Sequence, residues 1–362
     1  MKIASLFFFS ILLLNKTCAQ LIPLDTSEYQ RLRGLVKDES FFIYLDSTDA
    51  CRYLKRADYK LQLKELKGAV TDYTHAIRLK PTTCEVTDNR GYAYYNRGAA
   101  EYQLKDYGQA AIDYKNALDA DPNNPNIYFA CGVVKTKLKD FKGAVQFFDK
   151  ALELSPKYRD AYFERGKANY ELKNYSGAVL DYTVALEQGG YTVEMYYCRA
   201  LAKSRVGDFT GAIIDDNKAI ELKSDYYEAY NNRGTAKNQL QDKVGAIQDF
   251  DKVLEIKPDD YDAYINRGPI KYQLNDYPGA LKDLNAAILL RPGNPEGYNN
   301  RGIVRYYLKD YRAAIRDYTK AIELSPDYAE AYYNRSLVYE KKGKSKKAAE
   351  DLKVAEALAK NR

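Results

Sequence analysis

The sequence predicts an all-α solenoid of stacked helical hairpins, and two observations carry that prediction. Shifted by a period of about 34 residues, the 362-residue chain superimposes on itself along most of its length from Ala50 onward. Each period holds two segments with helical apolar periodicity, separated by turn residues, and strand-like alternation is essentially absent. One hairpin cannot bury its own apolar face, whereas stacked copies bury a continuous core.

The repeats share a small set of positions with plain packing roles. The fourth residue is always Tyr, the eighth is small, the twentieth is Ala, and Pro closes several repeats. Small residues let the two helices of a hairpin approach closely, and Pro ends the second helix because it cannot continue it. The segment from Cys84 to Arg90 separates the first two repeats. The predicted repeats are 50–83, 91–124, 125–158, 159–192, 193–226, 227–260, 261–294, 295–328 and 329–362.

This pattern resembles the tetratricopeptide repeat family over residues 50–362. The resemblance implies a right-handed superhelix of antiparallel helix pairs whose first helices line a concave groove. It also implies a non-enzymatic scaffold that binds a protein or an extended peptide. Two features depart from the family pattern. The eleventh position, usually aromatic in the family, is mostly charged or polar here, as at Lys271. Pro269 falls inside a first helix, where it is either a tolerated kink or a bend that widens the groove.

The residues before the first repeat indicate export and capping. Residues 1–19 combine a basic start, an apolar run from Leu6 to Leu14 and small residues before Gln20, which is typical of a cleaved signal peptide. The apolar run is too short to span a bilayer, so we expect no membrane span in the mature chain. Lipidation at Cys18 fits less well. Residues 20–49 are expected to cover the open end of the first repeat. The predicted location is the periplasm, the cell envelope or the exterior.

An Arg at the seventh position and an Asp at the twenty-third position vary together. Both are present in every repeat except the third, where Cys131 and Phe147 replace them. These positions lie at similar heights on facing helices of a hairpin, so we expect a structural ion pair in each of the other repeats. The expected pairs are Arg56–Asp72, Arg97–Asp113, Arg165–Asp181, Arg199–Asp215, Arg233–Asp249, Arg267–Asp283, Arg301–Asp317 and Arg335–Asp351.

The resemblance places amide and aromatic side chains on the groove face of the first helices. Asn amides repeated at fixed spacing can donate to and accept from an extended backbone, and the alternative is that they cap or solvate the helix surface. Exposed aromatic rings can anchor a partner, and the alternative is that they stack on neighbouring repeats. The predicted groove residues are Tyr95, Asn96, Phe129, Phe163, Tyr170, Tyr197, Asn231, Asn232, Asn266, Asn299, Asn300, Tyr306, Tyr333 and Asn334.

The chemistry of catalysis and of nucleic-acid binding is missing from the sequence. The single histidine, His75, occupies a polar outer position, and the cysteine spacings do not resemble metal sites. We therefore predict no catalytic residues, no metal and no cofactor. Acidic and basic residues alternate instead of forming a basic face, which argues against nucleic acid as a partner. Cys51 and Cys84 flank the first hairpin and are candidates for a disulfide.

Two other functions stay open at this stage. One is self-association through the terminal repeats, since the last repeat ends without an added capping helix. The other is binding of glycan or cell-wall material through a Tyr-rich groove, since the chain contains 36 tyrosines.

Overall fold

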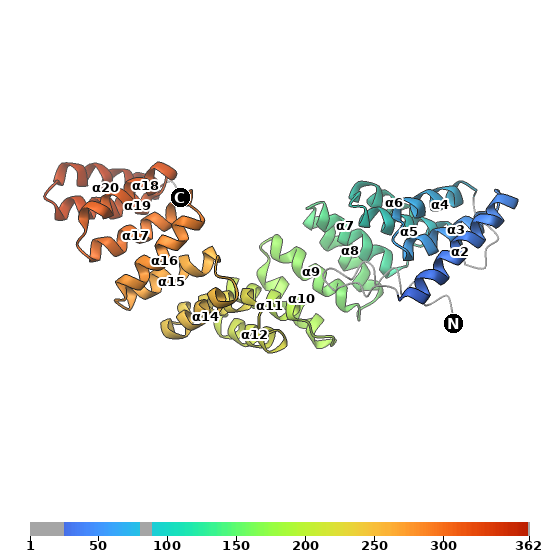
Figure 1. Ribbon diagram of the computed structural model, residues 1–362, viewed down its shortest axis with the longest axis horizontal. Coiled ribbons are helices and arrows are strands. Elements are labelled where there is room, and N and C mark those ends of the chain that lie inside the picture. Colours follow the sequence, from blue (N-terminus) through green and yellow to red (C-terminus); the bar gives the residue numbers. More distant parts are fainter. Residues whose placement is uncertain (1–24, 80–88, 361–362) are drawn as a thin grey trace. The chain divides into compact units, whose positions relative to one another are not determined.

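The structure is a computed structural model that describes residues 25–79 and 89–360, and every regular element within these ranges is an α-helix. It divides into two compact units, one up to Gly190 and one from Tyr191 onward (Figure 1). None of the described helices is long and apolar enough to cross a membrane. The signal-peptide prediction, Cys18 and Cys84 lie outside the described residues.

The N-terminal unit begins with a single helix, α2 (Thr26–Leu45), and continues with helix pairs. Each pair consists of a first and a second helix of one repeat, packed side by side. The pairs are α3 (Ala50–Gln62) with α4 (Leu66–Leu79), α5 (Asn89–Gln103) with α6 (Tyr107–Ala120), α7 (Pro125–Lys137) with α8 (Phe141–Leu154), and α9 (Arg159–Glu171) with α10 (Tyr175–Glu187).

The C-terminal unit has the same organisation without a preceding single helix. Its α15 continues through Pro269, so the proline does not end the helix. The pairs are α11 (Val193–Arg205) with α12 (Phe209–Leu222), α13 (Tyr227–Gln239) with α14 (Lys243–Ile256), α15 (Tyr261–Gln273) with α16 (Tyr277–Leu290), α17 (Pro295–Tyr307) with α18 (Tyr311–Leu324), and α19 (Ala329–Lys341) with α20 (Ser345–Lys360).

Each hairpin turns through one left-handed residue, and in seven of the nine described hairpins the next residue is an Asp or Asn that caps the second helix. Between α13 and α14, Gln241 has φ +64° and the next residue, Asp242, accepts a hydrogen bond of 2.9 Å from Gly245 N. Between α11 and α12 the left-handed position is Gly207, which adopts this conformation without the steric cost of a Cβ. An Asp or Asn side chain at the start of a helix satisfies an otherwise unpaired N–H group. This pairing fixes a short turn and starts the second helix at a defined residue.

A small residue at the eighth position allows the two helices of a pair to approach closely. A Cβ added to Gly302 would lie 2.6 Å from the Tyr318 ring, and one added to Gly166 would lie 2.7 Å from the Tyr182 ring. Both distances are shorter than real Cβ contacts, so a larger residue requires the ring to move. The large side chain at the twenty-fourth position therefore packs directly on the glycine.

The structure confirms the geometry expected for the Arg–Asp pairs. In each of the eight repeats that carry both residues, Nε and Nη2 of the Arg donate to the Asp carboxylate at 2.5–3.1 Å. The carboxylates are buried, from 0% exposed at Asp283 to 7% at Asp351. Two parallel bonds to one carboxylate fix the relative height of the two helices as well as supplying energy.

The remaining guanidinium nitrogen connects successive pairs. Nη1 of Arg233 donates to Asn217 Oδ1 on α12 at 2.5 Å, and Nη1 of Arg301 donates to Asn285 Oδ1 on α16 at 2.7 Å. In the first pair, Nη1 of Arg56 reaches Ser40 Oγ on α2 at 3.1 Å. One arginine thus holds its own hairpin together and also binds the helix that precedes it.

The charged eleventh position, which departs from the family pattern, supplies a second cation to the same Asp. Lys271 Nζ lies 2.9 Å from Asp283, and Arg305 Nη1 lies 2.7 Å from Asp317. The α5–α6 pair is different because Glu101 stands at this position, where burial and the nearby Asp113 raise its pKa to about 8. Its Oε2 atom is buried without a partner in the described part of the chain.

Helix α2 covers the first pair less completely than the sequence suggested. Leu32 and Ile43 are buried, and Arg52 Nη1 donates to Glu39 Oε2 at 3.2 Å. The apolar residues 41–45 form the last turn of α2 and do not pack as a separate cover over the first repeat. Phe41 is 59% exposed and Tyr44 is 85% exposed, since only one side of a helix can face α3.

Candidate functional site

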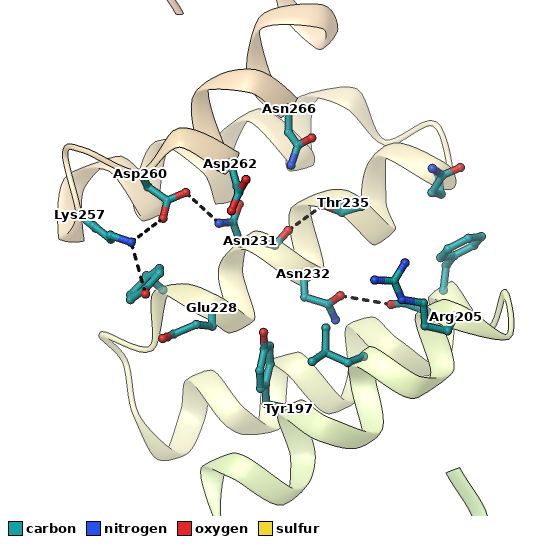
Figure 2. Close-up of a pocket in the computed structure, with 15 residues that line it drawn as sticks. Tyr197, Arg205, Glu228, Asn231, Asn232, Thr235, Lys257, Asp260, Asp262 and Asn266 are labelled. Carbon is teal, nitrogen blue, oxygen red and sulfur yellow. Dashed lines mark hydrogen bonds and ion pairs between the residues drawn. The ribbon is translucent and has the colours of Figure 1, made fainter. Parts of the chain in front are cut away.

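A cavity of about 620 Å³ lies on the first-helix face of the C-terminal unit (Figure 2). Its lining comes mostly from α11, α13 and α15, at the second, fifth, sixth, ninth, twelfth and thirteenth positions of their repeats. The lining residues are Tyr197, Leu201, Ser204, Arg205, Phe209, Tyr227, Glu228, Asn231, Asn232, Thr235, Gln239, Lys257, Asp260, Asp262 and Asn266. Four predicted groove residues, Tyr197, Asn231, Asn232 and Asn266, are therefore brought together at one site.

Two neighbouring asparagines on α13 lie at the centre of this cavity in Figure 2. Asn231 Nδ2 donates to Asp260 Oδ1 at 3.2 Å, and Asn232 Nδ2 donates to Asp216 Oδ2 at 2.7 Å. The Oδ1 atom of Asn231 is buried without a partner among the described residues. The Oδ1 atom of Asn232 accepts one long bond of 3.4 Å from Ser204 Oγ. Both amide groups are thus held by carboxylates, and their carbonyl oxygens are the less satisfied atoms.

Asp260 is an ionised anchor between α14 and α15. Burial opposes its ionisation, but hydrogen bonds from Ala263 N–H, Lys257 and Asn231 bring its pKa below the ordinary value. Lys257 Nζ lies 3.1 Å from this carboxylate and 4.7 Å from the centre of the Tyr227 ring. Because an ionised carboxylate only accepts hydrogen bonds, Asn231 must present its amide nitrogen to Asp260.

One residue that departs from the repeat pattern, Asp216, accepts a hydrogen bond from the cavity residue Asn232. The twenty-fourth position is aromatic or Leu in the other repeats, but in the α11–α12 pair it is Asp216, which is fully buried. Burial raises the pKa of Asp216 to about 8, while the hydrogen bond from Asn232 and the charge of Arg233 oppose that rise. Its Oδ1 atom has no partner in the described part of the chain.

The missing ring explains why Tyr197 lines the cavity. Where the fifth and the twenty-fourth positions are both aromatic, the two rings pack on each other, as Phe163 packs on Tyr182 with ring centres 5.6 Å apart. Tyr197 has Asp216 there instead, so its ring lies edge-on to Tyr226 at 5.3 Å and faces the cavity. Contact between the side chains at positions five and twenty-four could have been inferred from the repeat pattern, but it was not among our predictions.

The cavity has an acidic end and a basic end. Figure 2 places Glu228 and Asp262 toward one side and Arg205 at the other. Among the residues that the structure describes, Asp262 has only a long, exposed ion pair with Arg291, at 3.7 Å. Glu228 has no hydrogen bond or ion pair to any described residue. Lys257 is neutralised by Asp260, which leaves the acidic end with uncompensated negative charge.

Several predicted groove residues are not exposed on this face. Tyr95 is 1% exposed, Phe129 is 2% exposed and Phe163 is 8% exposed, so the prediction that they are contact anchors is wrong. Their rings pack on the aromatic residue at the twenty-fourth position of the same repeat, at 5.5–5.8 Å between ring centres. Tyr333 is different because Leu352 stands opposite, and it is 47% exposed.

The Asn amides predicted to repeat along the groove face do not form a continuous exposed row. Asn96 is buried and donates to Tyr92 O at 3.2 Å, while Asn299 is buried and accepts from Asn334 Nδ2 at 3.0 Å. These amides bond within the protein because their helices pack too closely to leave them exposed. Asn266 is exposed at the cavity rim, and Asn300 is half-buried. Tyr170 and Tyr306 pack on Tyr175 and Tyr311, with ring centres 5.1 and 5.7 Å apart.

Neither His75 nor Cys131 lines this cavity, and the described residues hold no cluster of metal-ligating side chains. No set of three or more His, Cys, Asp or Glu residues in residues 25–79 and 89–360 has the geometry of a metal centre. His75 is exposed and stacks on Tyr53 at 5.1 Å. The Cys131 thiol is buried, and burial raises its pKa to about 12. Because Cys84 is not described, the Cys51–Cys84 disulfide stays a prediction.

The stacked pairs and the cavity on their first-helix face define a helical repeat scaffold. Sequence models of the tetratricopeptide repeat match the chain in most of its repeats. One described as TPR repeat matches residues 98–139, 268–308 and 304–343, and two described as Tetratricopeptide repeat match 135–191, 227–260 and 329–361. The chain is a tetratricopeptide repeat protein. Proteins of this family are typically non-catalytic interaction scaffolds.

Solved structures are similar to the chain in fold alone. The C-terminal part of a TPR repeat-containing protein from Cytophaga hutchinsonii has a TM-score of 0.56 and 19% identity, covering 68% of this chain and 98% of that one. A tetratricopeptide repeat protein from Parabacteroides merdae has a TM-score of 0.50 and 20% identity, covering 72% and 97%. The APC/C hetero-tetramer Cut9–Hcn1 has a TM-score of 0.52 and 16% identity, covering 92% and 62%. No curated protein matches the chain in sequence.

Proposed function

We propose that the chain is an exported, non-enzymatic scaffold that holds an extended segment of a partner protein. The cavity between α11, α13 and α15 is its principal contact site. The observation that carries this proposal is the concentration of half-satisfied amides, uncompensated carboxylates and a free aromatic edge in one cavity of about 620 Å³. Such a cavity is large enough for side chains of a bound peptide, and its fixed polar groups give orientation and specificity.

The repeats around the cavity are built to hold it rigidly. The Arg233–Asp249 and Arg267–Asp283 pairs fix the hairpins on which Asn231 and Asp262 lie. A binding surface that needs little ordering loses less free energy when a partner binds. The ion pairs therefore contribute to binding through preorganisation and do not themselves contact the partner.

Site-specific photo-crosslinking in native cells tests this proposal. A photoreactive residue at Thr235, which lines the cavity, is compared with one at Lys218, an exposed residue on α12. We expect Thr235 to crosslink to a discrete partner and Lys218 to give no such product. The partner is then purified and titrated into the chain and into an Asn231→Ala variant, with weaker binding expected for the variant. Equal crosslinking from both positions, or equal affinity of the variant, contradicts the proposal.

A further inference from the structure

At the floor of the cavity, the side-chain amides have hydrogen-bond acceptors left for a ligand but no donors. The amide nitrogens of Asn231 and Asn232 are both occupied by carboxylates, at 3.2 and 2.7 Å. What remains is the buried, unpartnered Asn231 Oδ1 and the weakly bonded Asn232 Oδ1. A buried acceptor without a partner is destabilising, and a ligand that donates a hydrogen bond to it removes that penalty. The floor thus favours ligand groups that donate hydrogen bonds. It cannot both donate to and accept from a peptide group, as repeated Asn amides along an extended backbone would have to do.

The charges around that floor favour a cation. Glu228 has no ion pair among the described residues, and Asp262 has only the exposed pair with Arg291. Arg205 lies at the far end of the cavity in Figure 2, and Lys257 is already paired with Asp260. A cation beside Glu228 is therefore attracted by carboxylates that the protein leaves uncompensated.

An aromatic surface at the same end is compatible with a cation. Lys257 Nζ already lies over the Tyr227 ring at 4.7 Å, and Tyr197 presents a second ring toward the cavity. Cations bind favourably over aromatic faces, particularly where water is partly excluded. Acceptors, carboxylates and rings together are what an ammonium or guanidinium group requires, because both groups only donate hydrogen bonds.

We infer that this cavity binds an alkylammonium or guanidinium group, supplied by a Lys or Arg side chain of the partner. This inference rests on the proposed function and names the chemistry that the site selects. Asp216 is a positioning residue in this arrangement. It holds the Asn232 amide nitrogen, so the Asn232 carbonyl oxygen faces the ligand.

Calorimetric titration of the full chain with defined probes tests the inference. The probes are acetyl-Ala-Arg-Ala-amide, the same peptide with Lys, and matched peptides with citrulline or norleucine, which are neutral and similar in shape. n-Propylguanidine reports a guanidinium without a peptide. We expect the Arg and Lys peptides to bind about tenfold more tightly than the neutral peptides, as a charged hydrogen bond contributes. We also expect n-propylguanidine to bind more weakly than the Arg peptide.

Matched variants locate the effect. Glu228→Gln should weaken binding of the Arg peptide about tenfold and leave binding of the citrulline peptide unchanged. Glu221→Gln, an exposed carboxylate on α12 that pairs with Lys218 at 2.7 Å, should change neither. Equal binding of Arg and citrulline peptides overturns the inference and leaves the proposed scaffold function standing. Absence of binding by every cationic probe also overturns it. Binding of n-propylguanidine as tightly as the Arg peptide overturns the assignment to a partner side chain.

The pH dependence gives a readout that a purely structural role of Asp216 does not predict. Ionised Asp216 attracts the ligand more strongly than neutral Asp216, so affinity for the Arg peptide should rise as pH rises through about 8. Asp216→Asn, which preserves shape, should bind with no such rise. A rise of equal size in the variant contradicts this role. The charged and titratable groups that face Asp216 are Tyr197 on α11, Asp215 on α12, Arg233 on α13 and Asp249 on α14.

Discussion

Replacing Glu101 tests how the second cation of each ion-pair cluster contributes to stability. In the pairs with Lys203, Lys237 or Lys271 at this position, the lysine lies 2.8–2.9 Å from the Asp that the Arg also binds. Glu101 instead places a like charge beside Asp113 in a buried location. We expect Glu101→Gln to remove this repulsion and Glu101→Lys to replace it with an attraction.

The magnitude follows from the raised pKa of Glu101. The folded chain keeps a proton that the unfolded chain releases between pH 4.5 and about 8. The free energy of unfolding therefore falls as pH rises through this window, by at most about 1.4 kcal/mol per pH unit. Solvent that reaches the side chain and relaxation around it reduce the total, so we expect a loss of about 2–4 kcal/mol. Glu101→Gln should lack this loss.

Denaturant unfolding of the wild-type chain and the variants, at pH near 5 and above 8, measures this difference. Amide hydrogen exchange of α5 and α6 reports the same difference locally, which matters because repeat arrays open in parts. Glu153→Gln, an exposed residue paired with Lys150, is the matched control. The reasoning is refuted if Glu101→Gln loses as much stability with pH as the wild type. It is also refuted if Glu101→Lys unfolds more easily than the wild type above pH 8.

Two further predictions concern packing within the pairs, each measured by denaturant unfolding. Asp283→Ala should lower the free energy of unfolding by about 3–5 kcal/mol because it removes the buried carboxylate that the partly buried Arg267 and Lys271 share. The double change Arg267→Cys with Asp283→Phe, as in the third repeat, should cost less, and an equal or larger loss in the double variant contradicts this. Gly302→Ala should cost about 1–3 kcal/mol because its Cβ would lie 2.6 Å from the Tyr318 ring, and a neutral effect would show that the ring yields freely.

The sequence predicted the repeat architecture well because its constraints are local and periodic. The Arg–Asp pairs could be inferred because residues seven and twenty-three change together, as at Cys131 and Phe147 in the third repeat. In all but the α5–α6 pair, the first helix of each described pair begins at the residue where a repeat was expected to start. Helix α5 begins at Asn89, within the segment that separates the first two repeats.

The candidate site was less accessible to sequence reasoning. Whether a fifth-position ring faces the groove depends on the side chain opposite it on the second helix, as the contrast between Phe163 and Tyr197 shows. Likewise, Asn299 looks the same as Asn231 in the repeat, yet it is buried against Asn334. A single residue that breaks the pattern, Asp216, was the available signal. Its consequence depends on three-dimensional packing that periodicity does not describe.

Selection from a random linear peptide library tests the central claim most directly, because it works without an identified partner. The full chain and its Glu228→Gln variant are presented with the same library. The account predicts that the wild-type chain enriches peptides with a shared Arg or Lys, and that the variant loses this preference. Enrichment without a basic residue, or an unchanged basic preference in the variant, would contradict the claim that this cavity recognises a cationic side chain.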